Sequence, residues 1–349
     1  MGINKLLPHI SGLVSPRLVK DLSGQVAGID GHVWLHRSLL RRFQRDPKGV
    51  SMRSHIDFFL RRSHELNRWG IKPVFVFDGA DLPAKLGTKQ ARRIDRAANM
   101  ARGISLREIG EHSPAALHFA KATHVTFALV HELVLTLRAN GIDAFVAPYE
   151  ADAQLSWLAK SGLIDFVISE DSDLLIYGCP RVLFKLDFGS GFGLEVTGPV
   201  RRASAFSSLN DELVTFACVL AGCDYFENVR GVGLKTAMNI LRKFQHFSTD
   251  LQTLTESVCD SLIEVNPHSG NERLRLIKDL RTAVMVFRHQ TVYNPVSGSL
   301  ESVTKPDFDL IDLDEYMIGS SYEPEIATGV YHGSRHPVTK ATLTRNIHH

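Results

Sequence analysis

Four short apolar stretches, separated by long helix-like segments, constrain the fold of this chain more than any other feature. They are QVAGID (25–30), KPVFVFD (72–78), IDAFVAP (142–148) and DFVISED (165–171), each with β-branched or aromatic residues. Such runs alternating with helices are typical of parallel strands in one sheet. The sequence therefore predicts an α/β fold in which a twisted, mostly parallel sheet is flanked by helices.

Acidic residues lie at the ends of these predicted strands. Three of the runs end on or near an aspartate: Asp30, Asp78 and Asp171. After the run at 142–148, Glu150 and Asp152 begin an amphipathic helix, where the helix dipole also favours acids as caps. The carboxyl ends of parallel strands meet at one edge of a sheet, and the loops there form the ligand crevice. We therefore expect the carboxylates to converge, with capping open as the alternative for Glu150 and Asp152.

The stretch FVISEDSDLLIYG (166–178) indicates what these carboxylates bind. It places Glu170, Asp171 and Asp173 within four positions. Like charges this close repel one another unless a cation or unusual protonation compensates them. The expected ligands are all oxygens, with no His or Cys at zinc spacing, which favours Mg²⁺ or Mn²⁺ over zinc. The sequence predicts a divalent-metal site.

Positive charge is concentrated in one part of the chain. From His36 to Arg107 there are 17 Lys and Arg residues against 6 Asp and Glu, a local net charge of +11 in a chain of net charge +2. Solvated helix surface explains such charge equally well when it is taken alone. The basic runs RRFQR, RRSHELNR and KQARRIDR recur at helical spacing, which favours a surface that faces phosphates. Carboxylates beside such a surface point to phosphoryl chemistry.

The segment FACVLAGCDYFENVRGVGLKTAMNILRKF (216–244) predicts a pair of helices. An apolar helix leads to a loop that holds Asp224, and Gly231 and Gly233 open a second helix with Lys235 in its first turns. Backbone N–H groups at such a start can hold a phosphate, as in helix–hairpin–helix DNA binders. A tight connection between two helices is the simpler alternative for the glycines.

Membrane attachment is not expected. No stretch approaches the roughly 20 uncharged apolar residues of a membrane span, and the first residues lack a secretory pattern. Leu6 stands where a myristoylation signal has Ser or Thr. The four cysteines form no CxxC pair and suit the reduced thiols of a cytosolic or nuclear protein: Cys179, Cys218, Cys223 and Cys259.

Together these motifs resemble the catalytic domain of the flap endonuclease superfamily of structure-specific 5′ nucleases, and within it the exonuclease 1 branch most. The resemblance runs through MGINKLLP, GIDGHVWLH, PVFVFDGADLPAK, VAPYEADAQLSWLAKSGLIDFVISEDSDLLIYGC and LAGCDYFENVRGVGLKTA, and is weaker beyond about residue 250. YEADAQL and EDSDLL resemble exonuclease 1, whereas flap endonucleases tend towards SEAEAQ and EDMD.

The resemblance implies a PIN-like 5′ nuclease fold with a helical arch and a helix–two-turn–helix DNA-binding element. It implies one catalytic domain over 1–349, made of an N-terminal nuclease region (1–100), an arch insertion (80–130), an internal nuclease region (138–225), a helix–two-turn–helix (211–245) and a C-terminal helical, wrapping region (246–349). The first half of the arch insertion has few large apolar residues, so we expect it to be mobile until DNA binds.

The resemblance also implies a two-metal site for two Mg²⁺ ions, with Mn²⁺ able to substitute. Its seven acids are Asp30, Asp78, Glu150, Asp152, Asp171, Asp173 and Asp224. Asp152, Asp171 and Asp173 are the expected direct ligands, and the others are expected to act largely through ordered waters.

Basic residues of the family's arch hold the scissile phosphate and the displaced 5′ strand. Lys85 and Arg92 match the two that act in catalysis, with a solvated helix face as their alternative. The expected DNA-binding residues are His36, Arg93, Lys185, Gly231, Gly233 and Lys235. His36 matches a ring that stacks on an unpaired base. His32 replaces the tyrosine usual in exonuclease 1, so stacking and a neutral core histidine are both open.

A K⁺ ion is commonly held by the family's helix–two-turn–helix through loop carbonyls and serine hydroxyls. Ala221 and Asn228 stand where exonuclease 1 has serines, so two side-chain ligands are missing or changed. Backbone carbonyls alone are left for the ion.

The implied function is that of a Mg²⁺-dependent 5′-to-3′ double-stranded DNA exonuclease with 5′ flap endonuclease activity, in DNA repair, mismatch repair and recombination. Its substrate is duplex DNA with a nick, gap, recessed 5′ end or 5′ flap, and it is expected to act as a monomer in the nucleus. No protein partner can be read from the sequence. The alternatives are a flap endonuclease of replication, a catalytically silent DNA-structure scaffold and a metal-dependent ribonuclease of the PIN type. The seven acids argue against a scaffold, and the long basic insertion argues against a small ribonuclease.

Overall fold

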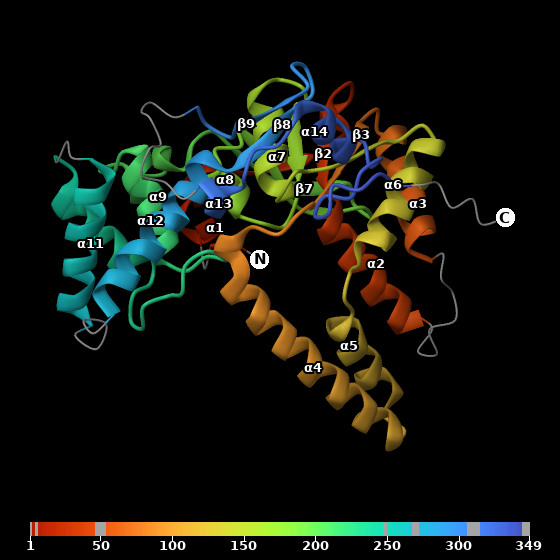
Figure 1. Ribbon diagram of the computed structural model, residues 1–349. Helices are drawn as coiled ribbons and strands as arrows, with labels where there is room; N and C mark the ends of the chain where they lie inside the picture. The colour runs from red at the N-terminus through yellow and green to blue at the C-terminus, as the bar shows by residue number, and fades with distance from the viewer. Residues whose placement is uncertain are drawn as a thin grey trace.

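A seven-stranded sheet runs through the centre of the protein (Figure 1). The computed structural model describes residues 2–3, 6–45, 54–246, 250–266, 272–305 and 315–343. The strands are β1 (Val14–Leu18), β2 (Val26–Asp30), β3 (Lys72–Phe77), β4 (Asp143–Val146), β5 (Phe166–Ile168), β6 (Arg181–Asp187) and β7 (Phe192–Thr197), in the spatial order β1-β7-β6-β5-β2-β3-β4.

The four predicted strands are confirmed as β2 to β5, which form adjacent parallel pairs. β6 continues the parallel part of the sheet, whereas β7 and β1 are antiparallel to their neighbours. These three strands were not predicted, although FGSG (188–191) between β6 and β7 carries a turn signal. The carboxylate of Asp187 accepts hydrogen bonds from the N–H groups of Gly189 (3.0 Å) and Ser190 (3.1 Å) and so shapes that turn.

Helices cover both faces of the sheet. One layer contains α2 (Gly31–Arg45), α3 (Ser54–Arg68) and α6 (Phe127–Ala139). The other contains α7 (Ala151–Lys160), α8 (Asp173–Ile176), α9 (Asp211–Leu220), α10 (Leu234–Leu241), α11 (Leu251–Val265) and α12 (Arg273–His289). Side chains alternate along a strand, so neighbouring residues of β3 face opposite sides of the sheet. Phe75 and Phe77 pack with the layer of α2, α3 and α6, and Val76 packs with the layer that contains α7.

The arch segment (80–130) contains two helices that extend away from the body (Figure 1). A short turn, η3 (Pro83–Lys85), leads into α4 (Leu86–Glu108), and α5 (His112–Ala122) packs back along α4 and against α2. Gly103 is the buried residue of α4, and a Cβ built on it would lie 2.8 Å from the ring of Phe119. The two helices therefore meet closely at one point, while Leu86, Ile94 and other apolar side chains of α4 are exposed.

The predicted pair of helices in 211–245 is present as α9 and α10, followed by the turn η6 (Arg242–Phe244). Asn210 caps α9 by accepting a hydrogen bond from the Leu213 N–H at 2.8 Å. After α12 come a hairpin of β8 (Thr291–Asn294) and β9 (Ser299–Ser302), then α13 (Glu315–Ile318) and α14 (Pro324–Tyr331). This region returns across the molecule, since β8 packs on α7 and α14 packs beside β4.

The remaining short elements are α1 (Leu6–His9), η1 (Ser11–Leu13), η2 (Val19–Leu22), η4 (Val200–Arg202) and η5 (Ser204–Phe206). All four cysteines are free thiols, and three of them are buried. Over the described ranges, every helix is too short or too polar to cross a membrane.

Candidate active site

Asp30 ends β2 and anchors the start of α2. Its Oδ1 accepts hydrogen bonds from the N–H groups of His32 (3.0 Å) and Val33 (3.1 Å). The side chain is buried, and burial together with the nearby charge of Asp78 raises the pKa of Asp30 to about 7. The ionised form of Asp30 is therefore disfavoured by burial and by repulsion from Asp78.

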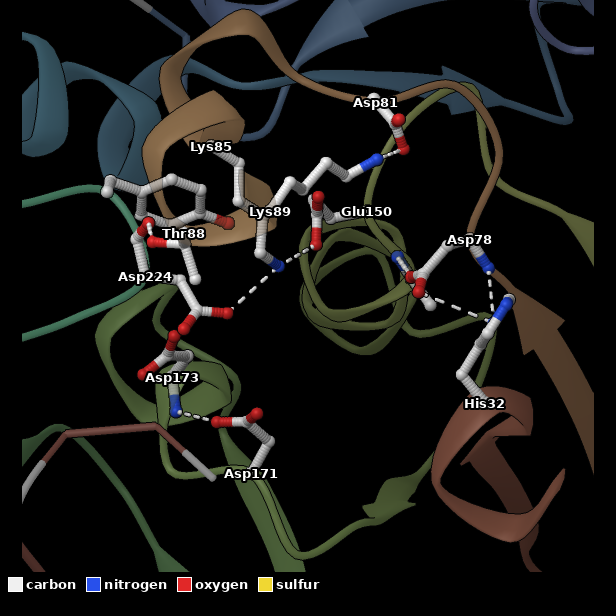
Figure 2. A network of polar contacts seen from close by, with 12 residues as sticks. His32, Asp78, Asp81, Lys85, Thr88, Lys89, Glu150, Asp171, Asp173 and Asp224 are labelled. Atoms are coloured by element: carbon white, nitrogen blue, oxygen red, sulfur yellow. Dashed lines mark hydrogen bonds and ion pairs between the residues drawn. The ribbon is translucent and has the colours of Figure 1, made fainter. Parts of the chain in front are cut away.

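Asp78 follows β3 and connects three elements. Its Oδ1 accepts a hydrogen bond from the N–H of Ala151, the first residue of α7, at 2.8 Å. Its own N–H donates to His32 Nδ1 on α2 at 3.0 Å (Figure 2). Burial by itself raises the pKa of Asp78, but its interactions with His32 and Lys85 outweigh burial, and the net pKa is lowered. The half-buried His32 thus supports Asp78 by bonding to its backbone.

Asp152 and Asp173 are the least compensated carboxylates. Asp152 lies in the first turn of α7, and Asp173 begins α8. The Oδ1 atom of each is buried, and no residue in the described ranges forms a hydrogen bond with it. Burial first, and then the charge of Asp171, raises the pKa of both side chains well above the ordinary aspartate value. Two buried oxygens without a partner, among like charges, are what a cation would compensate.

Glu150 occupies the cap position of α7, yet its side chain forms no cap hydrogen bond. Asp78 supplies the bond to Ala151 instead, so capping was the wrong alternative for Glu150. Glu150 Oε2 lies 2.6 Å from Lys85 Nζ. Both side chains are only 12% exposed, which makes this a buried ion pair.

Lys85 and Arg92, at the start of α4, turn towards the acids. Lys85 Nζ also lies 3.1 Å from Asp224 Oδ2, so it bridges Glu150 and Asp224 (Figure 2). Arg92 donates to both carboxylate oxygens of Asp224, at 2.9 and 2.7 Å. Burial would lower the pKa of Lys85, but the charges of Glu150 and Asp224 outweigh burial and raise it. Lys85 is therefore a fixed positive charge inside the group of acids.

Thr88 and Lys89 were missed by the sequence analysis. Thr88 Oγ1 donates a hydrogen bond to the carbonyl oxygen of Asp224 at 2.6 Å, and Lys89 forms an ion pair with Asp81. Both follow Lys85 by three or four positions on α4, and this spacing on one helical face was the available signal.

The seven predicted acids, which we call the acidic cluster, interact electrostatically across four strand ends and the α9–α10 loop. They are Asp30, Asp78, Glu150, Asp152, Asp171, Asp173 and Asp224. In the part of the chain that the structure describes, no three His, Cys, Asp or Glu side chains are already arranged to hold one ion directly. Lys85 and Arg92 pair with two members of the cluster, Glu150 and Asp224. The direct ligation expected of Asp152, Asp171 and Asp173 stays a prediction.

Gly2 packs directly against the acidic cluster. A Cβ built on it would lie 2.3 Å from Asp171 Oδ1 and 2.8 Å from Asp173 Oδ1, and its φ of +84° also favours glycine. A cavity of about 710 Å³ lies beside the cluster, bordered by Gly2, Thr88, Asp224, Arg275 and Met317 among others. The N-terminal segment and the base of α4 therefore share one opening.

Five of the six expected DNA-binding residues lie on α2, on α4, and at the start of α10. His36 is exposed on α2, one turn beyond His32, and Arg93 is exposed on α4. Gly231, with φ +86°, and Gly233 precede α10, and a Cβ built on either would meet nothing within 4 Å. The exposed Lys235 lies in the first turn of α10. The backbone of this loop is thus open to close approach.

Lys185 is exposed on β6, with a positive φ of +52°. Its N–H donates to Glu170 Oε1 at 3.0 Å, and the same oxygen lies 2.9 Å from an Arg37 nitrogen. Glu170 therefore pairs with α2, unlike its neighbours Asp171 and Asp173.

A K⁺ site with side-chain oxygens does not fit the loop between α9 and α10. Ala221 has no side-chain oxygen, and Asn228 Nδ2 donates a hydrogen bond to the carbonyl oxygen of Ala221 at 2.7 Å. An N–H donor, rather than an oxygen ligand, thus faces this carbonyl.

Comparison with known proteins places this site in a family. Models of the XPG N-terminal domain and the XPG I-region match residues 1–99 and 141–224. The DNA damage-inducible protein DIN7 of Saccharomyces cerevisiae is 30% identical over 311 residues, which cover 87% of this chain and 69% of that protein. The chain belongs to the flap endonuclease superfamily. The recognition made from the sequence motifs is confirmed.

Within the superfamily, the chain is similar to exonuclease 1. Exonuclease 1 of Arabidopsis thaliana is 32% identical over 342 residues, 97% of this chain and 45% of that protein. Exodeoxyribonuclease 1 of Schizosaccharomyces pombe is 33% identical over 349 residues, 98% of this chain and 58% of that protein. The chain thus spans about half the length of these relatives.

Solved structures of the superfamily share the fold. The catalytic core of Rad2 with DNA substrate superposes with a TM-score of 0.57 at 19% identity, covering 95% of this chain and 99% of that one. A second complex of the same core gives a TM-score of 0.56 at 22% identity, covering 82% and 81%. The α/β 5′ nuclease fold expected from the sequence is confirmed.

Proposed function

We propose that this flap endonuclease superfamily member is a divalent-metal-dependent, structure-specific DNA nuclease, acting as a 5′-to-3′ exonuclease with 5′ flap endonuclease activity. The observation that carries the proposal is the pair of buried carboxylate oxygens without partners, on Asp152 and Asp173, next to cations that begin the arch segment. The similarity to exonuclease 1 supports the direction of attack. The structure of the Holliday junction-resolving enzyme GEN1 in complex with product DNA and a Mg²⁺ ion supports the choice of ion.

The acidic cluster would hold two Mg²⁺ ions, with Mn²⁺ able to substitute. Asp152, Asp171 and Asp173 would supply direct ligands, and Asp30, Asp78, Glu150 and Asp224 would act through ordered waters. When bound, two such ions activate a water and neutralise charge on the scissile phosphate. Asp78 keeps α7 and its Asp152 in position through the bond to Ala151.

Lys85 and Arg92 have two sets of partners in this proposal. Without substrate they neutralise Glu150 and Asp224. Once the acids have other counter-ions, both cations are free to contact the scissile phosphate from the base of α4. Arg92, whose Nη2 now donates to both carboxylate oxygens of Asp224, can grip a phosphate with two of its nitrogens, while Lys85 adds a point charge.

Duplex binding is assigned to residues outside the acidic cluster. Gly231, Gly233 and Lys235 would hold a backbone phosphate, because the loop is open and leads into the positive end of α10. The remaining contacts are assigned to His36, Arg93 and Lys185. The regions at 80–130 and 211–245 would act as the arch and the helix–two-turn–helix of one catalytic domain. Its substrates would be nicked, gapped, 5′-recessed or flapped duplexes, cut by a monomer in nuclear DNA repair and recombination.

Labelled substrates test the proposal directly. The protein, with its natural N-terminus because Gly2 touches the acidic cluster, is incubated with 5′-recessed duplex, nicked duplex, 5′ flap and single-stranded RNA, in Mg²⁺ or EDTA. We expect mononucleotides to be released from the recessed 5′ end in Mg²⁺ and not in EDTA. Asp173→Ala should lose this cleavage. Glu170→Gln is its matched control and should keep the cleavage, since Glu170 shares the acidic stretch but pairs with Arg37.

Other outcomes would replace the proposal. Longer fragments from the flap substrate alone indicate a flap endonuclease of replication. Tight duplex binding without Mg²⁺-dependent cleavage indicates a scaffold, and cleavage confined to RNA indicates a ribonuclease.

A further inference from the structure

The loop between α9 and α10 contains a side-chain donor at an unusual place. Ala221 is the C-cap residue that directly follows α9, and it is 2% exposed. Carbonyl groups in the last turn of a helix have no partner within the helix. Asn228, seven residues later, donates its Nδ2–H to the Ala221 carbonyl oxygen at 2.7 Å. The side chain of the loop thereby holds the end of the helix.

The backbone of the loop leaves room for this amide. Gly222 has a φ of +107°, and a Cβ built on it would lie 3.1 Å from Asn228 Nδ2 and 3.4 Å from Asn228 Cβ. Any other residue at 222 would be strained and would also press on the asparagine. Gly222 and Asn228 therefore fit each other as a pair.

A cation and an N–H group compete for one carbonyl oxygen, because both approach its lone pairs with positive charge. The family resemblance implies K⁺ here, bound by loop carbonyls and serine hydroxyls. In this chain both serines are replaced, by Ala221 and Asn228, and the amide already faces the carbonyl. The residues present thus supply the positive end of a dipole where the family supplies an ion.

We propose that the Asn228 amide replaces the monovalent cation and keeps the α9–α10 loop in its DNA-binding shape without K⁺. The inference rests on the proposed DNA binding by Gly231, Gly233 and Lys235. A cavity of about 450 Å³ borders Ala221, Asn228, Gly233 and Lys235, so the amide lies at the edge of the surface assigned to a phosphate. Because an amide is neutral, Lys235 has to supply charge that a K⁺ ion would otherwise add.

The test compares salts at equal ionic strength. Affinity for a nicked duplex is measured by fluorescence anisotropy in EDTA, and the Tm is measured without DNA, each in potassium, sodium and choline chloride. For the native protein, the Kd is expected to change by less than about twofold among the three salts, since a hydrogen bond within the chain needs no ion. Its Tm is expected to be the same in all three.

Two variants and one control sharpen the comparison. Asn228→Ala should raise the Kd about fivefold in every salt, the size of one lost neutral hydrogen bond. The double variant Ala221→Ser, Asn228→Ser should bind more tightly in potassium than in choline, by about threefold or more, and its Tm should follow the same order. Asn140→Ala is the control: Asn140 Nδ2 donates to the Thr136 carbonyl at 2.8 Å at the end of α6, away from the α9–α10 loop, so its loss should leave the Kd unchanged and should not make the Tm depend on K⁺.

The inference would be overturned if the Kd of the native protein were at least fivefold higher in choline than in potassium, or if its Tm were lower in choline than in potassium. An Asn228→Ala protein whose Kd is no higher than that of Asn140→Ala would overturn it as well. A third outcome separates the two proposals. If the protein binds no duplex in any salt, the proposed function fails. If the Tm is then independent of K⁺ in the native protein but rises with K⁺ in the double variant, the amide inference stands.

Discussion

Replacement of Lys85 by methionine removes the positive charge at the centre of the acidic cluster while keeping a long side chain. Lys85 Nζ pairs with Glu150 at 2.6 Å and with Asp224 at 3.1 Å. Removing one partner of a buried ion pair typically costs about 3–5 kcal/mol. Asp224 keeps Arg92 as a partner, so we expect a loss near the lower end, about 3 kcal/mol. Chemical unfolding in EDTA measures it.

The same replacement should strengthen divalent-metal binding. Two unit charges 4 Å apart, at an effective dielectric constant of 20, interact with about 4 kcal/mol, which is an upper bound because Lys85 can swing away. We expect a gain of at least about 1.4 kcal/mol, or tenfold in Kd for Mn²⁺, by isothermal titration calorimetry. Cleavage should nevertheless slow strongly in single turnovers, because charge that stabilises the transition state is lost.

Lys89→Met is the matched control. Lys89 lies one turn further along α4, and its partner Asp81 is 63% exposed, so its ion pair is worth little. The two variants should differ in stability, metal affinity and cleavage rate. If Lys85→Met bound Mn²⁺ no more tightly than Lys89→Met, or were equally stable in EDTA, the bridging role of Lys85 would be refuted.

Three further predictions concern other parts of the molecule. Asp173→Ala should abolish cleavage and leave duplex affinity within a few fold, because binding depends on distant phosphate contacts; substantial Mg²⁺-dependent turnover in the variant would contradict the metal assignment. Amide hydrogens of 80–130 should exchange rapidly in the free protein and slow on duplex binding, since α4 buries little; strong protection without DNA would be the opposite result. Glu195→Gln should cost about 2 kcal/mol at pH 7, because the Glu195 carboxylate accepts hydrogen bonds from Arg17 and Arg181. Burial alone raises the pKa of Glu195, but these bonds outweigh burial and lower it, so the stabilisation is present above the ordinary value of 4.5 and is lost as the pH falls through the lowered pKa. Urea unfolding at pH 7 and pH 3 measures the difference, which should shrink in acid.

Several features of this protein follow from its sequence alone. The four predicted strands could be found because each is a short apolar run. β2, β3 and β5 are buried along most of their length, and the edge strand β4 alternates between half-buried and buried positions. The acids Asp30, Asp78 and Asp171 could be brought to one edge because parallel strands place their carboxyl ends together. The edge strand β1 escaped prediction because VSPRL contains a proline and gains its pairing only from β7, about 180 positions away.

The tertiary structure alone decided the partners of each charge. Nothing local distinguishes Glu170, which pairs with Arg37, from Asp171 beside it, which joins the acidic cluster. Likewise, Lys85 pairs with Glu150, which lies 65 positions away in the sequence, and with Asp224 in the α9–α10 loop. A side chain pairs with whatever group the packing of distant elements brings within about 3 Å, and the energy of that pair depends on burial that the same packing creates. Residue types along the chain therefore specify the chemistry available, while the folded geometry specifies which charges compensate one another.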